Sequence, residues 1–207
     1  MDSHESIVIC IIIVITLLWY GTQNKPSYNR VPKKIWTYWR EEPNGLVYPS
    51  KKELECVESW KKWNPEYEII TLTKKTFPGY VIIPNEIREH PIFIEHDRIN
   101  TDFIHLVRLW TLAEHGGVWL DSTVMLTRPL DEWMFPRYAE FSGIYKEGIE
   151  TYFMAVNRKS AFLREWVNSF SKLATATAAA TANANAIHLS FKEVFYKFPA
   201  HLFVFNK

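Results

Sequence analysis

Apolar residues recur at intervals of three and four along residues 99–113, which is the clearest repeat in the chain. This spacing places the apolar side chains on one face of a helix. Gly116 follows at the point where a helix end favours a left-handed residue. A short apolar run at residues 117–121 comes next and ends on Asp121. The pattern predicts a helix, a glycine turn and a buried strand that delivers a carboxylate at its end.

Strands and helices are predicted to alternate over the rest of the chain. β-Branched and aromatic residues predict strands at 33–39 and 67–72, with a third short strand at 80–83. Ser50 and Glu53 form a capping box at the start of a helix that stops before Pro65. The remaining predicted elements are a short helix at 85–89, strands at 140–145 and 152–156, and helices at 160–173 and 187–198. This alternation predicts an α/β fold with a mainly parallel sheet flanked by helices.

An apolar run at residues 7–20 stands apart from this pattern. It is shorter than the roughly 20 residues that a membrane-crossing helix needs. No small-residue cleavage site follows it, and Trp19 and Tyr20 suit a membrane interface. We therefore interpret residues 1–24 as a membrane anchor, with a cleaved signal or a buried segment as the alternatives. Residues 25–32 are interpreted as a linker and residues 33–207 as one domain.

The charges around this run bear on its orientation. Acidic residues precede it, and basic residues follow it: Lys25, Arg30, Lys33 and Lys34. The positive-inside rule then keeps the body of the protein in the cytoplasm, whereas a transferase of the secretory pathway would face the lumen. The prediction is a single-pass membrane protein, with both orientations left open.

Composition narrows the chemistry. The 207 residues, with 47% hydrophobic and 23% charged, are typical of a globular domain. A net charge of +1 gives no argument for nucleic acid, so no nucleic-acid partner is predicted. Cys10 lies in the apolar run, so neither a disulfide within the domain nor a cysteine zinc site is expected with Cys56. Residues 174–186, almost entirely Ala, Thr and Asn, are interpreted as a weak helix or a disordered insert.

Asp121 is the leading candidate for chemistry, because ligands of α/β proteins collect where strands end. A carboxylate there suits a divalent metal ion or a sugar hydroxyl, although it could also cap the following turn. Arg108 could clamp phosphate or sugar oxygens, or form a surface ion pair. Asp102, His105 and Arg108 follow one another at steps of three, so all three are predicted to line one pocket with Asp121.

Aromatic and acidic residues offer further candidates. Trp36, Tyr38 and Trp39 at the end of the first strand could stack on a nucleobase, and they could equally form a buried aromatic strand. Asp131 and Glu132 could bring a second carboxylate to a metal ion, but a solvated loop is the preferred interpretation.

Residues 108–124 read RLWTLAEHGGVWLDSTV. This block resembles the signature of the capsular-polysaccharide-synthesis-type glycosyltransferases, relatives of the DXD sugar-binding mannosyl- and galactosyltransferases. Residues 31–39 and 59–68 are similar to the first strand of that family and to the helix-to-strand passage after it, and residues 155–166 are similar more loosely.

The resemblance implies a Rossmann-like GT-A fold, a UDP- or GDP-sugar donor, a glycan acceptor, transfer with retention, and Mn²⁺ or Mg²⁺. Asp121 falls on the first acid of the DXD motif and would hold the metal ion. Arg108 falls on the arginine thought to hold donor oxygens. The donor site predicted in this way also contains Trp36, Tyr38, Trp39, Asp102, His105, Gly116, Gly117 and Thr123.

Two departures from the family pattern affect this site. Thr123 replaces the second acid of the DXD motif, which removes one expected metal ligand. Ile104 and His105 stand where the family has a Ser-Asp pair, and Asp102 is a candidate substitute. The chain also ends where such enzymes usually continue. The sequence predicts a membrane-anchored hexosyltransferase, and the alternatives are an inactive sugar- or nucleotide-binding relative and a structural membrane-tethered protein.

Overall fold

The computed structural model describes residues 31–41, 46–93, 101–132, 134, 140–176, 186–198 and 202–206. Its elements in chain order are β1 (Lys34–Tyr38), α2 (Lys51–Trp63), β2 (Glu68–Leu72), η1 (Phe77–Gly79), α3 (Asn85–Arg88), η2 (Pro91–Phe93), α4 (Thr101–His115), β3 (Gly117–Leu120), η3 (Leu130–Glu132), β4 (Phe141–Tyr145), β5 (Ile149–Val156), α5 (Ala161–Ala176), α6 (Ala186–Phe195) and β6 (Leu202–Asn206).

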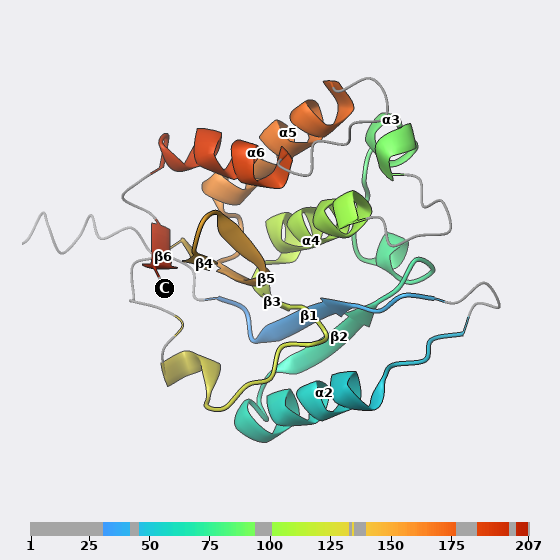
Figure 1. The fold of residues 1–207 in the computed structure, drawn as a ribbon, viewed down its shortest axis with the longest axis vertical. Helices are drawn as coiled ribbons and strands as arrows, with labels where there is room; N and C mark the ends of the chain where they lie inside the picture. Colours follow the sequence, from blue (N-terminus) through green and yellow to red (C-terminus); the bar gives the residue numbers. More distant parts are fainter. Residues whose placement is uncertain are drawn as a thin grey trace, which may run out of the picture.

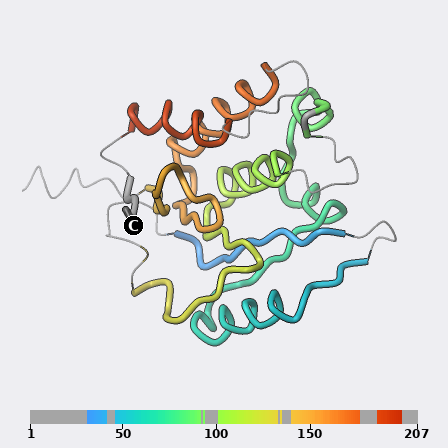
Figure 2. Tube along the Cα trace, in the orientation of Figure 1, coloured from blue at the N-terminus to red at the C-terminus, as the bar shows by residue number. Residues whose placement is uncertain are grey.

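These elements form three layers around one sheet (Figure 1). The strand order is β2-β1-β3-β5-β4-β6. Helices α4, α5 and α6 lie on one side of the sheet and α2 lies on the other, as the Cα trace also shows (Figure 2). The predicted α/β class is therefore confirmed.

The sheet is mainly parallel in the part of the chain that the structure describes. Strand β1 pairs in parallel with β2 and β3, and β4 pairs in parallel with β6. Strand β5 is antiparallel to both of its neighbours, β3 and β4. The strand order reverses at β1, because β2 and β3 lie on its two sides. In open α/β sheets, ligands bind beyond the carboxyl ends of the strands at such a point.

Alternating side chains of the central strands divide the core between the two faces. Trp36 and Trp119 face α4 and α5, where they join a cluster that includes Leu106, Leu109 and Trp166. Ile35, Val118 and Leu120 face α2, and they pack with its buried residues Cys56, Val57 and Trp60. Strands buried on both faces explain the nearly continuous apolar run before Asp121.

The capping box predicted at the start of α2 is present. The Ser50 hydroxyl accepts from the Glu53 N–H at 3.2 Å, and the Glu53 carboxylate accepts from the Ser50 N–H at 2.8 Å. Asn64 caps the other end, where its N–H donates to the Trp60 carbonyl at 2.9 Å. Both ends of α2 therefore lie where local sequence rules place them.

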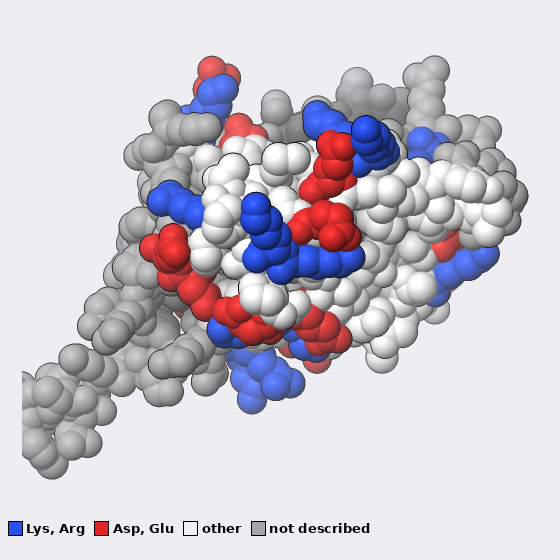
Figure 3. Space-filling view, turned by 90° about the horizontal axis from the view of Figure 1, so that it is seen from below, with Lys and Arg blue, Asp and Glu red and all other residues white. Residues whose placement is uncertain are grey.

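The exposed side of the α2 layer carries charges of both signs. Lys and Arg side chains lie among Asp and Glu side chains on this face (Figure 3). Lys61 pairs with Glu58 at 2.6 Å, and Lys51 pairs with Glu55 at 3.8 Å. Each exposed pair contributes at most about 1 kcal/mol, so α2 is held mainly by its buried face.

Gly116 and Gly117 join α4 to β3 with φ values of 64° and 100°. A Cβ on Gly117 would lie 2.8 Å from the Lys34 carbonyl oxygen and 3.0 Å from Trp36 Nε1. The backbone conformation and the contact with β1 both oppose a side chain here.

We expect Gly117→Ala to lower the free energy of unfolding by about 1–3 kcal/mol. Gly79→Ala is the matched control, because nothing lies within 4 Å of its added Cβ and its φ is not positive. The control should change stability by less than about 1 kcal/mol. Urea unfolding of both variants tests this expectation, and equal losses would contradict the close packing of β3 against β1.

Residues 80–83 do not form the predicted strand. Val81 and Ile83 are buried and Ile82 is 89% exposed, so the segment alternates as a strand would. However, it packs against the α4 side of the core without regular secondary structure. Pro78 and Pro84 flank it and cannot donate to a strand ladder. The alternation of buried and exposed residues at 80–83 therefore indicates burial and not strand pairing.

The membrane prediction is corrected. None of the helices in the described ranges is both long and apolar enough to cross a membrane. The anchor predicted at residues 1–24 lies outside the described residues, as do most of the linker and residues 177–185 of the low-complexity segment. The single-pass localisation and the membrane partner are not carried further.

Candidate functional site

The turn at Gly116 brings Arg108 level with Asp121. Helix α4 leads into the turn and β3 leads back out of it. Seven residues of helix, from His115 back to Arg108, span about 10 Å. Four residues of strand, from Gly117 to Asp121, span about 13 Å. Arg108 Nη2 accordingly donates to Asp121 Oδ1 at 2.5 Å, which joins the two leading residues of the sequence analysis.

Only one oxygen of the Asp121 carboxylate is held by the described residues. Oδ1 also accepts a hydrogen bond from Trp119 Nε1 at 2.8 Å, whereas Oδ2 has no hydrogen-bond partner among those residues. The main-chain N–H donates to the Tyr152 carbonyl at 3.0 Å. The side chain is 37% exposed. The carboxylate is thus fixed in orientation and still open to a ligand.

Arg108 lies under this carboxylate and is almost fully buried. The residue is 3% exposed. Its guanidinium carbon lies 5.1 Å from the centre of a Trp119 ring, and Nη1 lies 2.8 Å from His105 Nδ1. Burial lowers the pKa of Arg108, and the neighbouring Asp121 acts in the opposite direction. Its Nε has no partner among the described residues. Arg108 therefore positions Asp121, and little of the Arg108 side chain is exposed to a sugar donor.

His105 supports Arg108 as a neutral base. Burial lowers the pKa of His105 to about 3, with smaller contributions from the charges of Arg108 and His188. Because Arg108 can only donate, Nδ1 accepts, and Nε2 of the neutral ring carries the proton. Three side chains therefore form a chain from His105 through Arg108 to Asp121.

This neutral histidine has a consequence for stability. Below pH 6.5 the unfolded chain binds a proton at histidine, whereas folded His105 binds one only near pH 3, so acid favours unfolding. We expect stability to fall by about 1.4 kcal/mol per pH unit between roughly pH 6 and pH 4 from this residue. Urea unfolding of the wild type and His105→Asn over this range tests it. An unchanged slope in His105→Asn, compared with His90→Asn as control, would contradict the assignment.

Asp102 and Thr123 are not brought to the carboxylate. Asp102 lies half-buried in the first turn of α4, where burial raises its pKa, and no hydrogen bond or ion pair joins it to the described residues around Arg108. Thr123 is exposed in the turn that follows Asp121. Their predicted donor-binding roles stay predictions without a contact to support them.

The ring of Trp36 lies with Gly116 and Gly117 at the other end of β3. Trp36 is fully buried, its Nε1 donates to the Gly116 carbonyl at 2.9 Å, and its ring stacks on His115 at 5.2 Å. The structure therefore places these three residues in the core beneath the helix turn and away from Asp121.

Tyr38 and Trp39 lie at the carboxyl end of β1, which is the same end of the sheet as Asp121. Tyr38 packs against the cluster on the α4 side, and Trp39 packs against the cluster on the α2 side. The β1–β3 register pairs Trp36 with Trp119, which puts Tyr38 level with Asp121. Tyr38 is half-buried and meets Phe103 edge-on, with ring centres 6.2 Å apart. Trp39 is half-buried, and its buried Nε1 has no partner among the described residues.

The sequence analysis missed a second acidic side chain at this end of the sheet. Ser122 Oγ donates to Glu53 Oε1 at 2.7 Å. Burial raises the pKa of Glu53, but the hydrogen bonds from Ser122 and Ser50 outweigh it, so the pKa is lowered. Ser122 is adjacent to Asp121 in sequence, but no spacing rule could link it to a residue 69 positions away.

Asp121 is the candidate carboxylate for a metal ion. The described residues contain no group of three or more His, Cys, Asp or Glu side chains that could hold a metal. Asp131 is held elsewhere, by the Tyr67 hydroxyl at 2.5 Å and by Lys33 at 3.2 Å. Mg²⁺ often binds through one or two carboxylates and completes its coordination with substrate phosphates. Asp121 fits that mode of binding.

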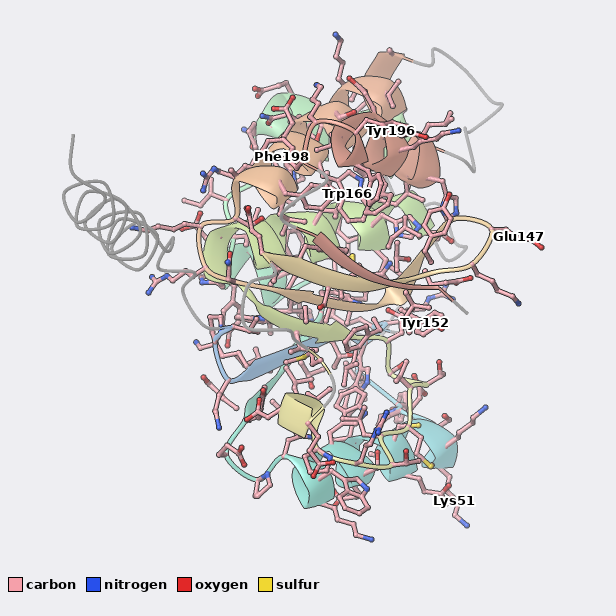
Figure 4. The ribbon with its side chains drawn as sticks, turned by 90° about the vertical axis from the view of Figure 1, so that its left-hand side faces the viewer. Lys51, Glu147, Tyr152, Trp166, Tyr196 and Phe198 are labelled. Carbon is pink, nitrogen blue, oxygen red and sulfur yellow. The ribbon has the colours of Figure 1, made fainter. Side chains whose placement is uncertain are left out.

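A cavity of about 230 Å³ lies between the segment after β3 and the β4–β5 hairpin. It is lined by Val124, Met125, Leu126, Thr127, Arg128, Ile144, Tyr152 and Phe153. In Figure 4, Tyr152, the Glu147 turn between β4 and β5, and Lys51 at the start of α2 all lie toward the same end of the sheet.

Comparisons with known proteins identify the family of the chain and structures of similar fold. Residues 18–195 match the family described as capsular polysaccharide synthesis protein. A solved structure titled "PaToxG Glycosyltransferase" is similar in fold, with a TM-score of 0.59 and 14% identity over 96% of this chain and 81% of that one. A second solved structure, a transferase mutant, has a TM-score of 0.49 and 15% identity over 83% and 88%. No curated protein matches the sequence.

Proposed function

Because the chain belongs to the family of capsular polysaccharide synthesis proteins, we propose that it transfers a sugar from a nucleotide-diphospho-sugar to a glycan acceptor. The likeness of its fold to a glycosyltransferase structure supports this proposal. The donor would be a UDP- or GDP-sugar and the transferred group a hexose. Retention of configuration rests on the family resemblance of residues 108–124.

The observation that carries the proposal is the half-open carboxylate of Asp121. Its Oδ1 is held by Arg108 and Trp119 at 2.5 and 2.8 Å, and its side chain is 37% exposed. A side chain held in advance loses little further freedom when a ligand binds. The buried side chains of His105 and Arg108 hold Asp121 in this position.

Asp121 would hold Mn²⁺ or Mg²⁺ through the oxygen that Arg108 leaves open. The bound ion would supply Lewis-acid stabilisation of the negative charge that develops on the leaving diphosphate. Thr123 stands where a second acid would help, so the donor phosphates would complete the coordination. Metal use is therefore expected to depend on the donor.

Trp39 and Tyr38 would receive the nucleobase at the neighbouring strand end. Both side chains are half-buried, so part of each ring stays open to a ligand. Aromatic side chains stack on any base, which allows either UDP or GDP. This assignment excludes Trp36, because that ring is fully buried.

A thermal-shift screen of UDP- and GDP-sugars, each with and without Mn²⁺, tests donor binding. A ligand at 100 times its dissociation constant adds about 2.7 kcal/mol of stability, or roughly 5–10 °C for a domain of this size. A shift with one nucleotide class that disappears in Asp121→Ala would support the proposal. No shift with any donor would favour a purely structural role.

A further inference from the structure

The turn that follows β3 has Asp121 as its first residue. The Val124 N–H donates to the Asp121 carbonyl at 2.9 Å, which closes a β-turn with Ser122 and Thr123 at its centre. Strand β3 ends at Leu120, so the turn needs contacts with the layers on either side to keep one position. In Figure 1, α4 lies above the sheet and α2 lies below it.

Neighbouring residues of this turn are held from these opposite layers. On the α4 side, Arg108 Nη2 donates to Asp121 Oδ1 at 2.5 Å. On the α2 side, the Ser122 hydroxyl donates to Glu53 Oε1 at 2.7 Å. Successive side chains of an extended chain point to opposite faces, so one short segment can be tied to both layers. The position of Asp121 therefore depends on α2 as well as on α4.

Glu53 is itself held in place by the start of α2. Its other oxygen, Oε2, accepts the Ser50 N–H at 2.8 Å, and its own N–H donates to Ser50 Oγ at 3.2 Å. Although burial acts to raise it, hydrogen bonds from Ser122 and Ser50 lower the pKa of Glu53, so the side chain is a carboxylate at neutral pH. Hydrogen bonds to a charged acceptor are roughly twice as strong as those between neutral groups. The first turn of α2 thus presents an oriented, charged acceptor to Ser122.

Two further contacts with α2 hold the chain just after the turn. Trp60 Nε1 donates to the Val124 carbonyl at 2.7 Å, and the Leu126 N–H donates to Ser59 Oγ at 3.0 Å. Neither contact uses the Ser122 hydroxyl, so the segment stays attached to α2 when that hydroxyl is removed. A Ser122 variant is therefore expected to fold and to change the turn only locally.

We propose that Glu53, acting through Ser122, is a positioning residue that holds the Asp121 turn in the geometry that binds the nucleotide-sugar donor. The inference rests on the proposed function, because it adds to that reaction a residue with no contact to the donor. A misplacement of about 1 Å in a reacting group can cost about 100-fold in rate. Helix α2 also packs in the cluster that Trp39 joins, so one helix supports both proposed parts of the donor site.

Hydrogen exchange without any ligand tests whether the turn is held in this way. Ser122→Ala removes the hydroxyl, and Ser122→Thr keeps one. We expect the Val124 N–H to exchange about tenfold faster in Ser122→Ala and within about twofold of the wild type in Ser122→Thr. Ser50→Ala is the matched control, because it weakens the cap of α2 but leaves both hydrogen bonds that the Glu53 carboxylate accepts. An unchanged exchange rate in Ser122→Ala would overturn the proposal.

Donor affinity tests whether this position matters for binding. Calorimetric titration with UDP- and GDP-sugars in the presence of Mn²⁺ gives the donor Kd of each variant. We expect Ser122→Ala to raise Kd by about tenfold and Ser122→Thr to restore it to within about threefold of the wild type. Ser50→Ala should lower the melting temperature through its weaker cap and leave Kd within about twofold. A wild-type Kd in Ser122→Ala would contradict a positioning role, because only general stability would then have changed.

A double-mutant cycle tests whether Glu53 acts through Ser122. Glu53→Ala should raise the donor Kd at least as much as Ser122→Ala does. Adding Ser122→Ala to Glu53→Ala should then change Kd by less than about twofold, because the shared hydrogen bond is already lost. Fully additive losses would show that the two side chains act independently and would overturn the proposal.

The exchange measurement keeps this test separate from the proposed function, because it needs no donor. Faster Val124 exchange in Ser122→Ala would support the positioning of the turn even if the wild type bound no nucleotide sugar. That second result would count against the transferase proposal alone. Donor binding by the wild type with no change in any Ser122 variant would instead remove Glu53 and leave the proposed function in place.

Discussion

Asp121→Asn is expected to lower transfer from a nucleotide sugar by about 100- to 1,000-fold, because it removes the charge that would hold the metal ion, a contribution of several kcal/mol. The amide is nearly the same size as the carboxylate, so the loss would come from charge and not from shape. The Trp119 hydrogen bond to the side-chain oxygen can persist in this variant.

The same substitution should also weaken the fold, but by less. Removing one partner of a fully buried ion pair costs about 3–5 kcal/mol. Asp121 is 37% exposed, so solvent screens part of the charge left on Arg108. We expect a loss of about 1–3 kcal/mol in the free energy of unfolding, the usual value of a hydrogen bond to a charged group.

Asp131→Asn is the matched control for this experiment. Asp131 is an exposed acid paired with Lys33 at 3.2 Å, and it takes no part in the Asp121 cluster. Its transfer rate should stay within about twofold of the wild type, since exposed pairs contribute little. Comparable losses in both variants, measured at a temperature where both are folded, would remove Asp121 from the site.

The second large effect distinguishes Trp36 in β1 from Trp39, which directly follows that strand. Trp36→Ala should lower the free energy of unfolding by about 3–5 kcal/mol, because it empties a fully buried position and removes the hydrogen bond to the Gly116 carbonyl. Trp39→Ala should cost only about 1–2 kcal/mol, since that ring is half-buried.

The effect on nucleotide affinity should be larger for Trp39→Ala than for Trp36→Ala. Trp39→Ala is expected to weaken nucleotide binding by about 5- to 100-fold, the range of a stacking contact of 1–3 kcal/mol. Calorimetric titration with UDP and GDP, together with urea unfolding, measures both effects. If Trp39→Ala binds nucleotide as the wild type does, the base does not stack at the end of β1.

Local patterns predicted most of the elements around the site. The three- and four-residue apolar period, the glycine turn and the strand to Leu120 all lie within 22 residues, so no long-range pairing was needed to place them. The capping box of α2 is equally local. Arg108 and Asp121 belong to the same short unit, and this is why their contact could be expected.

The Asp102 prediction shows where spacing fails. Each residue turns a helix by about 100°, so a step of three leaves neighbours about 60° apart and two such steps leave them about 120° apart. His105 therefore reaches Arg108, and Asp102 falls on a different face. Residues spaced by three therefore do not stay on one face of a helix, because each step moves them further around its axis.

Long-range pairings lay beyond the sequence analysis for a different reason. The antiparallel place of β5, the additional strand β6 and the Ser122–Glu53 hydrogen bond depend on segments far apart in the chain. Trp36 was assigned to the nucleobase along with Trp39 because both share an aromatic strand. Their burial in the structure separates them, because Trp36 is fully buried and Trp39 is half-buried.

The most direct test of the central claim is turnover by the wild-type protein of a panel of UDP- and GDP-sugars, with and without Mn²⁺, measured as nucleotide release. We expect release with one nucleotide class and its loss in Asp121→Asn. Binding without release would identify an inactive relative. Neither binding nor release with any member of the panel would contradict a donor site at Asp121.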